Sequence, residues 1–150
     1  MIRKALVVDD DPMILCLLEY TLDLKGYDIT RATDADQAIK VLDTEDFDLV
    51  ITDLQMGRTS GFDVIRKTKA LNSRTIIIMI TGCCDSLNEA EAFRHGADDY
   101  LAKPFSLGDL LERLQLHEST HFCSPVATIQ RDQNGGKVSG NFTKCQTFFQ

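Results

Sequence analysis

The sequence predicts an α/β fold in which a five-stranded parallel sheet is doubly wound, with helices on both of its faces. Three observations support this. The 150 residues are 43% hydrophobic and 26% charged, which suits a single globular core. Short apolar runs rich in β-branched residues alternate with segments of helical spacing. Runs such as residues 75–80 are apolar at nearly every position, as expected of strands covered on both sides.

The runs that predict strands are short and evenly distributed. They are residues 5–8, 28–31, 49–52, 75–80 and 100–102, of which residues 28–31 have the weakest pattern. A helical segment separates each run from the next. Strands joined by helical crossovers lie parallel to one another, so a parallel sheet is expected.

The first helix has the best-marked ends. Asp11 stands where it can cap free backbone amides, Pro12 suits the first turn, and Gly26 is expected to end the helix. The second and third helices are expected at residues 35–42 and 61–71. A serine followed three residues later by an acid marks the start of the fourth helix at residue 86 and of the fifth at residue 106.

The C-terminal part of the chain has a different composition. After about residue 116 the helical periodicity stops, and residues 117–150 are rich in Ser, Thr, Asn, Gln and Gly. We therefore expect one folded domain at residues 1–116 and a tail at residues 117–150. The phenylalanines of this tail could dock on the domain or on a partner, and the sequence leaves this open: they are Phe122, Phe142, Phe148 and Phe149.

Charge and composition exclude several classes of protein. Acidic residues outnumber basic ones by 23 to 16, so the net charge of −7 disfavours direct binding to nucleic acid. No apolar run approaches the roughly 20 residues of a membrane span, and the first residues lack the pattern of a signal peptide. We expect a cytoplasmic protein. The odd number of cysteines, five, argues against a disulfide framework and for reduced thiols.

Chemically active side chains follow four of the predicted strands. Asp9 and Asp10 follow the first strand, Asp53 the third, Thr81 the fourth and Lys103 the fifth. Ligands of open parallel sheets bind at the carboxyl ends of the strands, so these side chains are expected on one rim.

The expected cluster of carboxylates indicates a metal ion, because gathered carboxylates repel one another unless a cation lies between them. All-oxygen ligands suit Mg²⁺ rather than zinc. A carboxylate beside Mg²⁺ can attack a phosphoryl donor, while an ammonium and a hydroxyl neutralise charge on the transferred oxygens. The sequence therefore favours phosphoryl chemistry at this rim.

The motifs at residues 8–10 (Val-Asp-Asp), 50–53 (Val-Ile-Thr-Asp), 79–81 (Met-Ile-Thr) and 100–105 (Tyr-Leu-Ala-Lys-Pro-Phe) agree in order, spacing and strand context. Over residues 2–116 the chain resembles the receiver domain of two-component response regulators, including chemotaxis regulators. The resemblance implies a flavodoxin-like fold with strand order 2-1-3-4-5. We expect no recognisable output domain in residues 117–150, because a DNA-binding domain would need more residues and a basic helix.

The resemblance implies a role for each acid. Asp53 would accept a phosphoryl group from a sensor histidine kinase or a phosphotransfer protein. Asp10, Asp53 and the backbone carbonyl of Gln55 would hold Mg²⁺, and Asp9 would support the metal through water. Asp11 is interpreted only as a helix cap.

The remaining members of the site are also implied by the resemblance. Thr81 and Lys103 would contact the phosphoryl group, and the backbone amides of Gln55 and Gly82 would complete its cradle. The bond between Lys103 and Pro104 is expected to be cis.

The family also implies a switch. Thr81 would move inward, Tyr100 would follow, and the face of the fourth helix, fifth strand and fifth helix would then engage a downstream protein effector, with pairing of two copies left open. Such a domain is a phosphoacceptor that assists its own phosphotransfer and dephosphorylation rather than a turnover enzyme.

The chain departs from the family at three positions. Gly57 follows Met56 where the family usually has proline, so the loop before Gly61 is expected to be less restrained. The second residues after the phosphorylated aspartate and after the threonine are Gln55 and Cys83, and the lifetime of the acyl phosphate is therefore left open.

Two other functions remain open. A phosphatase of the haloacid-dehalogenase type would use Asp9 as nucleophile, because residues 7–11 (Val-Val-Asp-Asp-Asp) match its first motif. That reading gives Asp53 no role and lacks the acids expected after Lys103. A receiver-like module that binds its partner without phosphorylation is the third possibility.

Two minor sites are less favoured interpretations. Cys83 and Cys84 could sense oxidants, but no neighbouring base lowers their pKa, so small loop residues are the better interpretation. The set His117, His121, Cys123 and Cys145 lacks the paired cysteines of a structural metal site. We interpret its members as solvated tail residues.

Overall fold

The computed structural model describes residues 1–82 and 86–121. The sheet contains β1 (Arg3–Val8), β2 (Tyr27–Ala32), β3 (Leu49–Asp53), β6 (Ile76–Thr81) and β7 (Asp99–Ala102). All four neighbouring pairs are parallel, and the order is β2-β1-β3-β6-β7. The predicted doubly wound sheet and its strand order are therefore confirmed.

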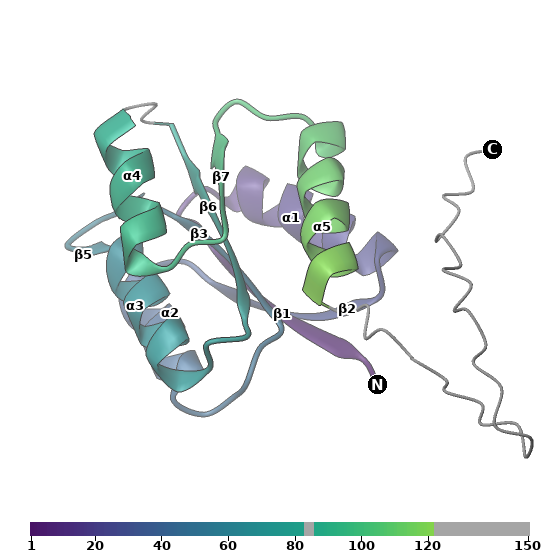
Figure 1. Cartoon of the computed structure of the whole chain (residues 1–150), viewed down its shortest axis with the longest axis horizontal. Helices are drawn as coiled ribbons and strands as arrows, with labels where there is room; N and C mark the ends of the chain where they lie inside the picture. The colour runs from purple at the N-terminus through teal and green to yellow at the C-terminus, as the bar shows by residue number, and fades with distance from the viewer. Residues whose placement is uncertain (83–85, 122–150) are drawn as a thin grey trace, which may run out of the picture.

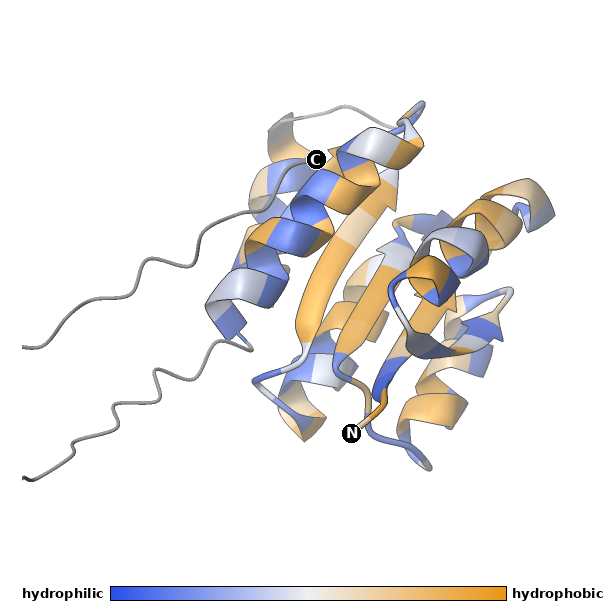
Figure 2. Ribbon diagram, turned by 90° about the vertical axis from the view of Figure 1, so that its right-hand side faces the viewer, coloured by the Kyte–Doolittle hydropathy of each residue, from blue (hydrophilic) through white to orange (hydrophobic). Residues whose placement is uncertain are grey.

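Helices cover both faces of the sheet (Figure 1). α1 (Pro12–Leu24) and α5 (Leu107–His121) lie on one face, and α2 (Ala35–Leu42), α3 (Gly61–Leu71) and α4 (Ser86–His95) lie on the other. In the turned view of Figure 2 the strands between the two helical layers are predominantly hydrophobic. This arrangement explains why the strands are apolar at consecutive positions rather than at alternate ones.

Alternation within β1 shows how the two halves of the core form. Ala5 and Val7 belong to the cluster with Leu18 and Leu110, from α1 and α5. Leu6 and Val8 belong to the cluster that contains residues of α2, α3 and α4. All four of these β1 side chains are fully buried, so the strand contributes to both halves of the core.

The start and end of α1 are as the sequence predicts. The side chain of Asp11 accepts a hydrogen bond from the backbone N–H of Met13 at 2.8 Å, and Pro12 occupies the first turn. Gly26 follows the helix with a φ of 77°, a left-handed conformation that glycine adopts without strain. The cap at Asp11 thus fixes the short connection between the carboxyl end of β1 and α1.

The fifth helix is longer than expected and ends at His121 rather than near residue 116. Glu118 explains the extension, because it accepts a hydrogen bond from the hydroxyl of Tyr27 at 2.8 Å and forms ion pairs with Lys25 at 2.7 Å and Arg3 at 2.9 Å. His117 lies 2.8 Å from a carboxylate oxygen of Asp99. Residues 117–121 therefore belong to α5 rather than to a tail, and of the two histidines only His121 is exposed as expected.

A small hairpin joins β3 to α3. β4 (Gln55–Met56) pairs antiparallel with β5 (Thr59–Ser60), and Gly57 in the turn has a φ of 69°. A positive φ at the first turn position alone is typical of a type II′ turn, which favours glycine. Thr59 also donates to a carboxylate oxygen of Asp36 at 2.8 Å. Gly57 therefore takes a conformation that proline could not adopt, and the lower restraint of the loop stays a prediction.

Several sequence predictions concern residues that lie outside the described part of the chain. These residues are Cys83, Cys84, Cys123 and Cys145 and the four phenylalanines of residues 122–150. Cys16, within the described part, is an exposed free thiol. A membrane-spanning segment is not found in residues 1–82 and 86–121, since no helix there combines the necessary length with an apolar sequence.

Candidate functional site

Side chains from the carboxyl ends of the strands meet around one ammonium group. Asp9 follows β1, Asp53 ends β3, and Lys103 follows β7. The Lys103 ammonium lies 2.7 Å from Asp9 Oδ2 and 3.0 Å from Asp53 Oδ2. Because β1 and β3 are neighbours and the sheet twists, residues far apart in the sequence come together here.

Asp9 is the most deeply buried acid of the site. Its side chain is fully enclosed, and Oδ1 accepts a hydrogen bond from the backbone N–H of Asp11 at 2.9 Å. Burial raises the pKa of Asp9 above its ordinary value, although the hydrogen bond from Lys103 opposes this shift. The ionised carboxylate therefore depends on a cation for its stability.

Lys103 supplies that charge in the structure. Burial disfavours its charged form, but hydrogen bonds with Asp9 and Asp53 outweigh this effect and raise the pKa of Lys103. The ammonium consequently stays charged at neutral pH. One cation thus lies between two carboxylates and offsets part of their negative charge.

The site also has the donor set of a small, hard metal ion. One carboxylate oxygen from each of Asp9, Asp10 and Asp53 lies within 4.8 Å of the others. Asp10 is exposed, whereas Asp9 and Asp53 are buried, so the cluster opens to solvent on one side. Oxygen-only ligands with room for water fit Mg²⁺.

The surroundings of Asp53 place polar backbone groups beside its carboxylate. The backbone N–H of Gln55 donates to Asp53 Oδ1 at 3.3 Å. Gly82 follows β6 at the surface, and its missing side chain would meet nothing within 4 Å. Gln55 and Gly82 thus follow the neighbouring strands β3 and β6, on the rim that carries Asp53.

Thr81 lies on β6 and Tyr100 on β7, two strands whose carboxyl ends form part of this rim. Thr81 ends β6 and is 1% exposed, and its carbonyl accepts the backbone N–H of Lys103 at 2.8 Å. Tyr100 pairs with Met79 in the sheet and packs, half-buried, against the core on the α2–α4 side. The bond between Lys103 and Pro104 is cis.

Gly61 fixes the backbone that carries Asp53. A Cβ atom at position 61 would lie 2.1 Å from the carbonyl oxygen of Asp53. The backbone N–H of Gly61 also donates to the carbonyl of Leu54 at 2.9 Å. Any side chain here must push the strand end away from its place.

A Gly61→Ala variant should lose about 1–3 kcal/mol of unfolding free energy, because the overlap is with backbone and cannot be relieved by a rotamer change. Urea denaturation followed by circular dichroism measures this loss. Gly108→Ala is the matched control: position 108 is an exposed helical site with only Ser106 Oγ nearby at 3.5 Å, and alanine there should stabilise α5 by roughly 0.5–1 kcal/mol. Equal stability of the two variants would contradict the prediction.

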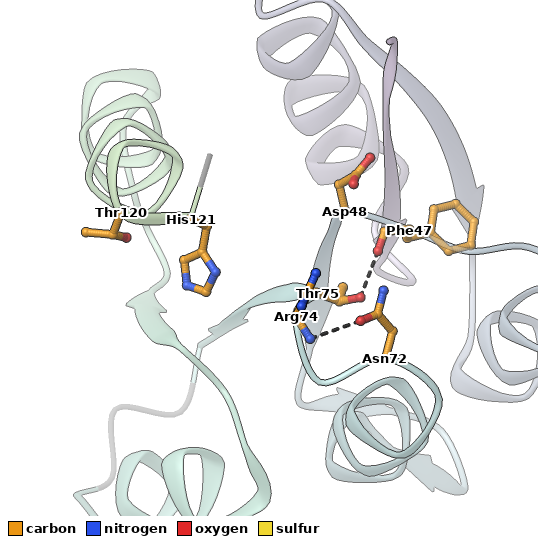
Figure 3. A pocket seen from close by; sticks show the side chains of 7 residues that line it. All are labelled: Phe47, Asp48, Asn72, Arg74, Thr75, Thr120 and His121. Atoms are coloured by element: carbon orange, nitrogen blue, oxygen red, sulfur yellow. Dashed lines mark hydrogen bonds between the residues drawn. The ribbon is translucent and has the colours of Figure 1, made fainter. Parts of the chain in front are cut away.

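A hollow of about 490 Å³ lies away from this site, at the opposite end of the sheet (Figure 3). Its lining includes Phe47 and Thr75, which precede β3 and β6, and His121 at the end of α5. The hydroxyl of Thr75 donates to the carbonyl of Phe47 at 2.7 Å. None of the rim residues lines this hollow, so its size does not mark the chemical site.

The sequence did not foresee the contact between Lys103 and Asp9. The resemblance assigned Lys103 to a phosphoryl group, whereas the structure places its ammonium closer to Asp9 than to Asp53. Asp9 lies 94 positions from Lys103 in the sequence, and no local pattern reports such a pair. The predicted strand order puts both residues on one rim, but it does not indicate a direct contact between them.

Comparison with known proteins agrees with this geometry. The sequence model of the response regulator receiver domain matches residues 5–115. The alkaline phosphatase synthesis transcriptional regulatory protein PhoP of Bacillus subtilis is 30% identical over 137 residues, which cover 91% of this chain. Those residues cover 57% of that relative, so the chain spans little more than half of its length.

Solved structures show the same fold. A CheY-like receiver domain protein from Methanospirillum hungatei superposes with a TM-score of 0.77 and 28% identity, covering 81% of this chain and 98% of that one. A response regulator from Burkholderia pseudomallei, solved with a phosphorylated aspartic acid, calcium ion and citrate, superposes with a TM-score of 0.68 and 29% identity, covering 79% and 74%. The matched family is not that of the phosphatase alternative. The chain belongs to the response regulator receiver domain family.

Proposed function

We propose that Asp53 accepts a phosphoryl group from a sensor histidine kinase or a phosphotransfer protein in the cytoplasm, in a reaction that depends on Mg²⁺. Phosphorylation of an aspartate is the general function of receiver domains, which interact with histidine kinases and downstream effectors. The observation that carries the assignment is the Lys103 ammonium, which bridges Asp53 and the buried Asp9.

The acidic cluster supports the metal assignment. Receiver domains bind Mg²⁺ through such a cluster, and Asp10, Asp53 and the backbone carbonyl of Gln55 would hold the ion, with Asp9 acting through water. When bound, Mg²⁺ adds positive charge that favours the approach of an anionic phosphoryl donor. The exposure of Asp10 leaves a path from solvent to this position.

The side chains of Asp53, Lys103 and Thr81 would then carry out the phosphoryl transfer. A carboxylate oxygen of Asp53 forms a bond to phosphorus as the phosphorus–nitrogen bond of a donor phosphohistidine breaks, and the released imidazole takes a proton from solvent. Lys103 and the hydroxyl of Thr81 neutralise the transferred oxygens, together with the amides of Gln55 and Gly82. A phosphorylated aspartic acid in the Burkholderia pseudomallei relative supports this chemistry.

The readout is proposed for the face formed by α4, β7 and α5. Tyr100 lies on β7, and the Thr81 carbonyl accepts a hydrogen bond from the backbone N–H of Lys103, directly after β7. Movement of Thr81 at the phosphoryl site would therefore be transmitted to β7. Exposed apolar side chains on the two helices suit a protein effector or a second copy: they are Leu87, Phe93 and Leu116. The signalling unit would comprise residues 1–121, without turnover of a separate substrate.

Incubation of the whole chain with acetyl phosphate and Mg²⁺, followed by intact mass measurement, tests the proposal. We expect one alkali-labile phosphoryl adduct, absent when EDTA is added, that maps to the peptide containing Asp53. Steady release of phosphate without an adduct, stopped by Asp9→Asn, would support the phosphatase instead. If neither adduct nor release is observed, the remaining possibility is a module that binds its partner without phosphorylation.

A further inference from the structure

α1 is apolar on two opposite faces, although only one of them is covered. Leu15, Leu18 and Leu22 are buried against the sheet. On the outer side Met13 is 79% exposed, and Tyr20 and Leu24 are each 61% exposed. Contiguous exposed apolar surface marks an interaction site, so we expect the outer face of α1 to have an occupant.

The three exposed side chains form one stripe. At about 100° per residue, Met13, Tyr20 and Leu24 lie within roughly 40° of one another around the helix axis. Cys16, also exposed, lies one turn from both Met13 and Tyr20. No segment of residues 1–82 or 86–121 covers this outer stripe, which we define as Met13, Tyr20 and Leu24.

The chain after α5 starts close to this stripe. Lys25, directly after α1, is 2.7 Å from Glu118 in the last turn of α5, and α1 and α5 lie side by side (Figure 1). Residues 122–150 follow immediately. The 29 residues would reach roughly 30 Å as a random coil, which exceeds the roughly 20 Å length of α1.

Charge and side-chain type also match. α1 carries two acids, Glu19 and Asp23, and no base. Residues 122–150 carry one acid against three bases, and they include the four phenylalanines Phe122, Phe142, Phe148 and Phe149. A second copy of the chain would instead bring like-charged acids together, with a net charge of −7 on each partner.

We propose that residues 122–150 dock on the outer stripe of α1, with phenylalanine side chains against Met13, Tyr20 and Leu24. Since α1 starts at Pro12, shortly after Asp9 and Asp10, the stripe begins near the phosphoacceptor rim. This docking does not depend on phosphorylation of Asp53. It is a property of the unmodified chain.

The alkylation rate of Cys16 by iodoacetamide, resolved by peptide mass spectrometry on the whole folded chain, tests the docking. A segment bound about nine-tenths of the time slows alkylation about tenfold. The variant Phe142→Ser/Phe148→Ser/Phe149→Ser should therefore react several times faster than wild type. Leu71→Ser, which removes an exposed leucine from α3 on the other face of the sheet, should react at the wild-type rate.

Two results would overturn the proposal. Equal rates in wild type and in the triple variant would show that the phenylalanines do not cover the stripe. Protection that increases with protein concentration would assign the stripe to a second copy. Because the assay contains neither phosphoryl donor nor Mg²⁺, its result is independent of the proposed phosphorylation.

Discussion

An Asp53→Asn chain should form no phosphoryl adduct with acetyl phosphate and Mg²⁺, at any time at which the wild-type chain is fully labelled. The amide oxygen of asparagine is too weak a nucleophile to attack phosphorus, and the neutral side chain is a poorer ligand for the metal. The fold should persist, because Lys103 keeps its 2.7 Å contact with Asp9. Intact mass measurement gives the adduct, and circular dichroism checks the fold.

Asp11→Asn is the matched control for this substitution. Asp11 is an exposed neighbour in the same acidic stretch, and its contact in the structure is the cap on the backbone N–H of Met13. Asparagine caps helices as well as aspartate does, so this variant should be labelled like wild type. An adduct that persists on the Asp53→Asn chain and maps to Asp9 would instead identify Asp9 as the nucleophile.

The strands and the rim were predictable because their signals are local or follow from topology. Every predicted strand lies within two residues of an observed one. Parallel strands put their carboxyl ends on one edge, so Asp9, Asp53 and Lys103 could be expected together before any coordinates were known. The order of the strands came from the family resemblance, since hydrophobic spacing does not determine which strands are neighbours.

The end of α5 could not be predicted from its own sequence. Residues 117–121 are His, Glu, Ser, Thr and His, none of which continues an apolar stripe. The helix continues because Glu118 meets Arg3, Lys25 and Tyr27, which come from segments more than 90 positions away. Burial raises the pKa of Tyr27 and its contact with Glu118 adds to this, so the pair is a tertiary feature rather than a local one.

The hairpin after Asp53 was missed for a different reason. Proline at position 57 would restrain the loop, and its absence suggested freedom. Glycine instead permits a tight turn, because Gly57 at a φ of 69° closes a two-residue connection between Met56 and Thr59. The identity of the substituted residue, rather than the loss of proline, determines the conformation next to the phosphoacceptor.

A Lys103→Met chain should lose both stability and phosphotransfer. In the absence of metal it leaves two carboxylates without their cation, one of them fully buried, and breaking such a pair costs about 3 kcal/mol of unfolding free energy. The phosphorylation rate should fall roughly 10²–10³-fold, since a preorganised positive group at the transferred oxygens is lost. Urea denaturation in EDTA and adduct formation over time measure the two effects.

The dependence of this loss on pH follows from Asp9. Burial already raises the pKa of Asp9 above 3.8, and removal of Lys103 raises it further. The folded state then holds a proton that the unfolded state releases, so the variant should lose stability as pH rises from about 3.8 through the raised pKa. The deficit relative to wild type should therefore be small in acid and largest at neutral pH.

Two controls separate this local effect from a general loss of charge. Lys4→Met removes an exposed partner of Glu45, 3.1 Å away, and should change stability little. Mg²⁺ should restore stability to the Lys103→Met chain more than to wild type, because in the variant the ion binds carboxylates that no ammonium already neutralises. A Lys103→Met chain that is as stable as wild type in EDTA at neutral pH would show that Asp9 does not require Lys103 for its charge.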